Sequence, residues 1–98
     1  MSNDILEILK IDLQISSSKY DTYLKKLILM AEDAITKEGI YIADVCTENE
    51  MLIEMYAAYL YRKRRGESAE MPRSLRYMLN NKLMSQKAGK CRWIVLHT

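Results

Sequence analysis

The chain has 98 residues, of which 49% are hydrophobic and 29% charged, a composition that is typical of one globular domain and excludes a disordered chain. No apolar run approaches the roughly 20 residues of a membrane-spanning helix, and the N-terminus is too weakly apolar for a secretory signal. We therefore expect a soluble protein made in the cytoplasm. A domain this short buries only about two thirds of its unfolded surface, so assembly with other copies would add burial.

The net charge of +2 hides an uneven distribution along the chain. Up to Tyr61, five Lys and Arg against eleven Asp and Glu give −6, whereas from Arg62 onward ten basic residues against two Glu give +8. Such asymmetry points to a charged partner. It fits a basic half that faces polyanions, and equally an acidic half of one subunit that meets the basic half of its neighbour.

Four helices are predicted, and the first is short, over about residues 4–10. The second is long, over about residues 18–37, because apolar residues recur there at helical spacing. Leu29 and Met30 widen its apolar face, which predicts burial on more than one side. Gly39 then provides a C-terminal stop.

The third helix is predicted over about residues 47–65, after a stretch, residues 40–46, that alternates weakly and could form a short extended piece. Thr47 and Glu50 have the spacing of a capping box, which places the helix start at Thr47. The helix ends in four consecutive basic residues, 62–65.

Pro72 suits the first position of a fourth helix, which is predicted to end around residues 87–89. The CRWIVL stretch after it has β-branched and aromatic residues and is too short to be stable alone, so we expect an extended arm that needs the edge or groove of a neighbouring subunit. Trp93 is the expected anchor of this arm. The predicted architecture is all-α: a small bundle of four helices over residues 1–89 and an extended C-terminal tail over residues 90–98.

Patterns of catalytic and metal-binding residues are missing from the sequence. It contains no GxSxG, no Walker loop, no HExxH and no glycine fingerprint, and three Gly residues could not supply most of these patterns. His97 is the single histidine, and Cys46 and Cys91 form no CxxC pair, so we expect reduced, structural thiols. We therefore predict no enzyme, no metal and no cofactor.

The basic run 62–65 allows three interpretations. It can be a solvated helix end whose cations complement the negative end of the helix dipole. It can contact a phosphate backbone in a salt-sensitive way, or it can contact the acidic surface of a neighbouring subunit. A DNA-reading helix-turn-helix is disfavoured, because the linker 66–71 is longer than the usual turn. The candidate residues for a subunit or DNA contact lie in this run, in the fourth helix and in the tail: Arg62, Arg64, Arg65, Arg73, Arg76 and Trp93.

Two long stretches carry a recognisable pattern. LEILKIDLQISSSKYDTYLKKLILMAEDAI, from Leu6 to Ile35, contains a short helix, a polar turn and a long Ala-containing helix. MLIEMYAAYLYRKRRGESAEMPRSLRYML, from Met51 to Leu79, contains a helix that ends in Tyr and basic residues, then a loop and a Pro that opens a Leu-rich helix. In this order, the two stretches resemble the head–tail connector family of long-tailed bacteriophages and prophages, also called head-completion or adaptor proteins. The most specific part is Y-x-x-R … P-x-x-[LV]-x-x-[LM]-L.

The resemblance implies a structural virion protein without enzymatic activity, assembled in the bacterial host cytoplasm and located at the head–tail interface. It implies a homo-oligomeric ring of about twelve copies below the portal protein. Such a ring extends the DNA channel, presents a surface to a downstream head-completion or tail protein, and can touch packaged DNA without sequence preference. The residues alone leave two alternatives: a small basic nucleic-acid-binding helical protein, or a helical interaction module with no virion role.

Overall fold

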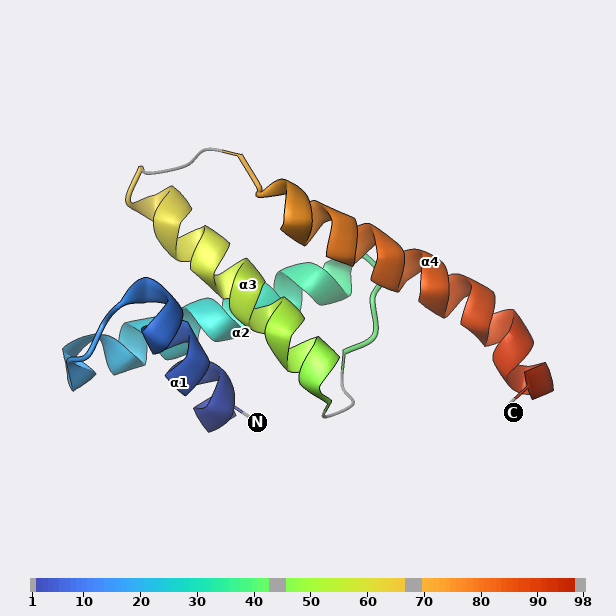
Figure 1. The fold of residues 1–98 in the computed structure, drawn as a ribbon, viewed down its shortest axis with the longest axis horizontal. Helices are drawn as coiled ribbons and strands as arrows, with labels where there is room; N and C mark the ends of the chain where they lie inside the picture. Colours follow the sequence, from blue (N-terminus) through green and yellow to red (C-terminus); the bar gives the residue numbers. More distant parts are fainter. Residues whose placement is uncertain (1, 43–45, 67–69, 97–98) are drawn as a thin grey trace.

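The computed structural model describes residues 2–42, 46–66 and 70–96, and the side chains of residues 5–42, 46–66 and 70–86. All regular structure in these residues is helical (Figure 1), which confirms the predicted all-α class with four helices. The elements in chain order are α1 (Ser2–Leu13), the short 3₁₀ helix η1 (Ser18–Tyr20), α2 (Asp21–Lys37), α3 (Thr47–Arg64) and α4 (Arg73–Leu96). No helix in the described part of the chain is long and apolar enough to cross a membrane.

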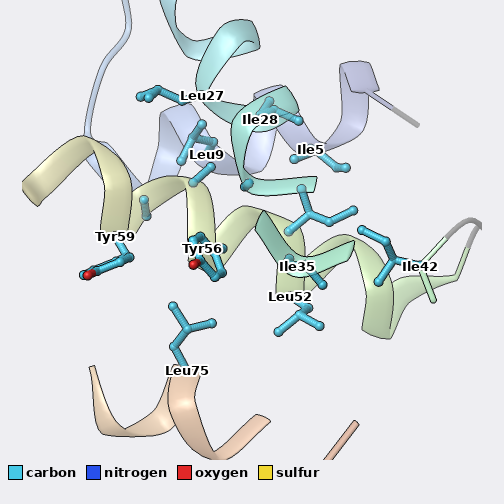
Figure 2. Close-up of a cluster of buried hydrophobic side chains, with 14 of the residues drawn as sticks. Ile5, Leu9, Leu27, Ile28, Ile35, Ile42, Leu52, Tyr56, Tyr59 and Leu75 are labelled. Carbon is cyan, nitrogen blue, oxygen red and sulfur yellow. The ribbon is translucent and has the colours of Figure 1, made fainter. Parts of the chain in front are cut away.

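Helix α3 is the centre of the fold and contacts each of the three other α-helices. Leu9 and Leu27 lie on one side of α3 and Leu75 on the other (Figure 2), so α4 covers a different face of α3 from α1 and α2. The core is built from the apolar stripes of all four helices and from two residues of the α2–α3 connection: Ile5, Leu6, Leu9, Leu24, Leu27, Ile28, Ala31, Ile35, Ile40, Ile42, Leu52, Ile53, Tyr56, Ala57, Ala58, Tyr59, Leu75 and Leu79.

The apolar stripe of α2 is buried on one side only. Its buried residues recur at helical spacing, as predicted: Leu24, Leu27, Ile28, Ala31 and Ile35. Leu29 and Met30 are 56% and 48% exposed, so the second buried side expected from the sequence is open to solvent in the single chain. At 100° per residue, these two positions lie far from the core-facing stripe.

The ends of α2 and α3 follow local backbone rules with one correction. Gly39 has φ +95° and its N–H donates to the Thr36 carbonyl at 2.9 Å, so it ends α2 as predicted. The predicted cap at Thr47 is wrong by one position: Cys46 is the N-cap, with extended backbone and no side-chain cap hydrogen bond. Thr47 is already helical because the Glu50 N–H donates to the Cys46 carbonyl at 3.0 Å.

The connection between α2 and α3 is partly strand-like. Ile40 and Ile42 are buried while Tyr41 between them is 61% exposed, which is the alternation that the sequence predicted. The backbone N–H of Tyr41 donates to Gln86 Oε1 at 2.8 Å, and Gln86 Nε2 donates to the Tyr41 carbonyl at 2.7 Å. The Gln86 side chain of α4 thus forms hydrogen bonds with both backbone groups of Tyr41, as a residue of a neighbouring strand would. Residues 43–45 of the predicted extended piece lie outside the described residues.

Helix α4 is longer than predicted, because its backbone remains helical to Leu96 where the sequence predicted an extended tail. A helix satisfies its own backbone hydrogen bonds, whereas an isolated strand leaves them unpaired, so a short apolar segment that follows a helix continues it readily. Gly89 does not interrupt the helix, since a single interior glycine costs only about 1 kcal/mol. The proposed boundary between residues 89 and 90 therefore falls inside α4.

Candidate functional site

The basic run at the end of α3 is divided among different surroundings. Arg62 reaches α1, where its Nη2 lies 3.4 Å from Asp12 Oδ1. Lys63 lies over a ring of its own helix, with its Nζ 5.6 Å from the centre of the Tyr59 ring. Consecutive residues of a helix point in different directions, so the four cations do not share one face.

The two remaining cations, Arg64 and Arg65, line a groove with a cavity volume of about 780 Å³ at one end of the bundle. Arg65 lies over the Tyr61 ring at 5.5 Å, and its Nη1 donates to the Tyr61 hydroxyl at 3.0 Å. Tyr61 in turn packs on Tyr23 of α2, with ring centres 6.3 Å apart. The other wall is the turn between α1 and α2, so the full lining is Leu13, Gln14, Ile15, Ser16, Ser17, Tyr20, Tyr23, Tyr61, Arg64 and Arg65.

The turn that forms this wall is held by hydrogen bonds among its own residues and those next to it. Gln14 has a backbone φ of +60°, a conformation that residues other than glycine rarely adopt. The Ile15 N–H donates to the Lys10 carbonyl at 2.9 Å, and the Ser17 Oγ accepts from the Lys19 N–H at 3.0 Å. The groove is therefore bounded by a defined turn on one side and by α3 on the other.

The arginines of α4 lie apart from this groove. Arg73 and Arg76 are exposed in the first turns of α4, which packs on the face of α3 opposite α1. Burial is the chief cause of the raised pKa of Tyr56, and the nearby Arg76 guanidinium partly offsets it, which places Arg76 next to the α3 core. The structure thus gathers two of the five candidate arginines in one site, and the side chain of Trp93 lies outside the described residues.

A buried carboxyl group lies beneath Arg62. Glu54 of α3 is 2% exposed and its Oε2 has no hydrogen-bond partner among the described residues. The pKa of Glu54 is raised from 4.5 to about 8, chiefly by burial and also by a hydrogen bond and like charge from Asp12, while Arg62 opposes the rise. At neutral pH the Glu54 carboxyl therefore favours its protonated form, and Asp12 joins it to Arg62.

Sequence reasoning missed this cluster, although a signal for it exists. Glu54 is the one charged residue within the otherwise apolar run 51–60, which is the pattern of a carboxyl carried into a core. The partners on α1 and at the end of α3 could not be assigned without the packing of α1 on α3. The cluster links α1 to α3, with Glu54 buried and Asp12 and Arg62 partly exposed.

The described residues hold no group of three or more His, Cys, Asp or Glu side chains that could bind a metal ion. Cys46 is an exposed free thiol. Cys91 lies in α4 beyond the described side chains, and His97 lies outside the described residues. Neither can be assigned a site.

Large apolar side chains are exposed on the helices and on the α2–α3 connection of the single chain. They are Ile11, Tyr20, Tyr23, Leu29, Met30, Tyr41, Met51, Tyr77 and Met84. The radius of gyration is 14.5 Å, whereas a compact domain of this length has a value of about 12.5 Å. These exposed apolar groups on an elongated chain are suited to contacts with other proteins.

Comparison with known families gives one match to this chain. Residues 3–87 match the sequence profile of the family described as phage gp6-like head-tail connector protein, and the match spans all four helices. No curated protein and no solved structure gives a significant match. The chain therefore belongs to the phage gp6-like head-tail connector family, and its role is that of a structural component of the virion.

Proposed function

We propose that the chain is the subunit of a ring that sits below the portal and extends the DNA channel toward the tail. The observation that carries this proposal is the family match over residues 3–87. The ring would contain about twelve copies, contact the portal on one side and a downstream head-completion or tail protein on the other, and touch packaged DNA without sequence preference.

Two physical properties of the chain support assembly. The accessible surface is 6646 Å², whereas a compact monomer of 11.5 kDa exposes about 5,800 Å². Much of the exposed apolar material consists of Tyr and Met side chains, and contacts between proteins are enriched in both. In a ring, contacts between copies would cover part of this exposed apolar surface and so add buried area to that of the small core.

The purified chain is expected to form a discrete large oligomer, because its exposed apolar groups gain burial only between copies. Size-exclusion chromatography with light scattering at low and high salt measures the mass, and electron micrographs show whether the particle is a closed ring. A chain that stays monomeric at high concentration and does not bind its portal contradicts the proposal. A monomer that binds DNA with a steep salt dependence would instead support the nucleic-acid-binding alternative.

Removing the residues after Gly89 is expected to reduce the oligomer without unfolding the bundle. We propose that the end of α4 is an arm that reaches a neighbouring subunit, with Trp93 as its anchor. Figure 1 shows this end running beyond the other three helices, and Leu79 is the last buried core residue among the described side chains, which extend to residue 86. Helical circular dichroism should persist in the truncated chain while the mass falls. Trp93→Ala is the milder variant, and unchanged oligomer mass in the truncated chain refutes the arm.

A further inference from the structure

The two walls of the groove are joined to each other by side chains next to its lining. Asp12 directly precedes Leu13 of one wall, and Arg62 directly follows Tyr61 of the other. Arg62 Nη2 lies 3.4 Å from Asp12 Oδ1, so this ion pair connects the end of α1 to the end of α3. The position of the α1–α2 turn against α3 therefore depends on what holds Asp12.

Glu54 adds a buried carboxyl group to this ion pair. It is 2% exposed, its Oε2 has no hydrogen-bond partner among the described residues, and its carboxyl shares a hydrogen bond with Asp12. Two carboxyl groups can share a hydrogen bond only when one of them carries a proton, and burial favours the neutral form of Glu54. Asp12 then accepts from Glu54 and from Arg62, and the three groups together are neutral.

Loss of that proton leaves two carboxylates and one guanidinium group in the cluster. An ionised Glu54 cannot be hydrated in place, because it is 2% exposed. The side chains of Asp12 and Arg62 are each 39% exposed and can turn. Either Asp12 turns to solvent or Arg62 turns to Glu54, and in both cases the link from α3 to the end of α1 is broken.

The other charged groups on the helices around the cluster do not replace this link. Lys10 of α1 pairs with Asp21 of α2 at 2.9 Å. Glu50, one turn before Glu54 on α3, is another carboxyl group. Helix α4 covers a different face of α3 from α1. Arg62 is thus the cation that acts on Glu54.

Most of α1 is held by apolar packing that does not depend on this proton. Ile5 and Leu9 are fully buried, so the body of α1 stays on the bundle when the cluster changes. Asp12 lies in the last turn of α1, where the helix dipole disfavours a negative charge. The part of the chain that responds is therefore the end of α1 and the turn after it, residues 12–17.

We propose that Asp12, Arg62 and protonated Glu54 form a clasp that holds the two walls of the groove together, and that loss of the Glu54 proton opens it. The protonation state of one buried carboxyl group thus sets the width of the groove. All three residues belong to one chain, so the clasp acts whether or not copies assemble and does not rest on the ring function.

The test measures the distance between the two walls in the full chain. Ser16→Cys and Arg64→Cys place one spin label on each wall, and Cys46→Ser and Cys91→Ser remove the native thiols. Electron paramagnetic resonance gives the distance between the labels at about pH 6 and about pH 9, on either side of the titration of the buried carboxyl. An excess of unlabelled chain leaves only distances within one copy. We expect a shift to longer and more broadly distributed distances at the higher pH.

Two variants remove the proton dependence by different routes. Glu54→Gln donates to Asp12 at every pH and should keep the short distance throughout. Asp12→Asn removes one of the two negative charges and can donate its amide to an ionised Glu54, so most of the shift should be lost. Glu50→Gln is the matched control, which keeps the clasp and should show the full shift. Circular dichroism and thermal melting confirm that each labelled form folds.

The outcomes separate the clasp from other causes of a pH effect. A wild-type distance that is the same at both pH values overturns the clasp, and so does a shift that survives in Glu54→Gln. If Glu54→Gln does not fold, Asp12→Asn decides, because a full shift in that variant excludes repulsion between the two carboxylates as the cause.

Discussion

Raising the pH from about 5 to about 9 should lower the melting temperature of this protein, and Glu54→Gln should remove most of that decrease. The folded-state pKa of Glu54 is raised from 4.5 to about 8, chiefly by burial. Between these values the folded state binds a proton that the unfolded state has lost. The stabilising contribution of this group is therefore complete below about pH 4.5 and is lost as the pH rises through about 8.

The Gln side chain has the size of the protonated carboxyl and can donate to Asp12 at every pH. At about pH 9 the variant should be more stable than the wild type by on the order of 1–3 kcal/mol, the usual cost of an unsatisfied buried polar group. Thermal melts followed by circular dichroism over this range measure the difference. Glu50→Gln is the matched control on the same helix, and because it keeps Glu54 its melting temperature should fall with pH as that of the wild type does. Parallel pH profiles for wild type and Glu54→Gln would show that another group titrates.

Leu27→Ala should destabilise the fold by about 2–5 kcal/mol, a large share of the roughly 5–15 kcal/mol that holds a domain of this kind together. Leu27 is 1% exposed and lies between α2 and α3 in the core (Figure 2). Truncation removes its buried methyl groups and leaves a cavity that the helices cannot fully close. Urea unfolding followed by circular dichroism measures the loss.

The matched control lies two residues further along the same helix. Leu29 is 56% exposed, so Leu29→Ala should change the free energy of unfolding by no more than about 0.5 kcal/mol. Any effect of Leu29→Ala on oligomer mass would then report on contacts between copies. Equal destabilisation by the two substitutions would contradict the burial that distinguishes them.

The helices could be predicted because they depend on local patterns. The apolar spacing of α2 and the positive-φ glycine after it are read directly from neighbouring residues, and the buried set of α2 follows the predicted stripe. The start of α3 at Thr47 was predicted, but its N-cap was misplaced by one residue, because a capping box is a spacing of side chains while the observed cap at Cys46 has no side-chain hydrogen bond. The length of α4 was underestimated because a β-branched segment has no fixed preference when it follows a helix.

The sequence by itself determined the helical class, the apolar faces and the separation of charge along the chain, because each depends on the order of residues. Only the tertiary structure decided where those charges lie. The packing of α1 and α2 against α3 pairs Arg62 with Asp12 and turns Arg64 and Arg65 into the groove. The same packing buries Glu54 against Asp12 from a helix more than 40 residues away. Such partners meet through long-range packing, which the spacing of neighbouring residues does not encode.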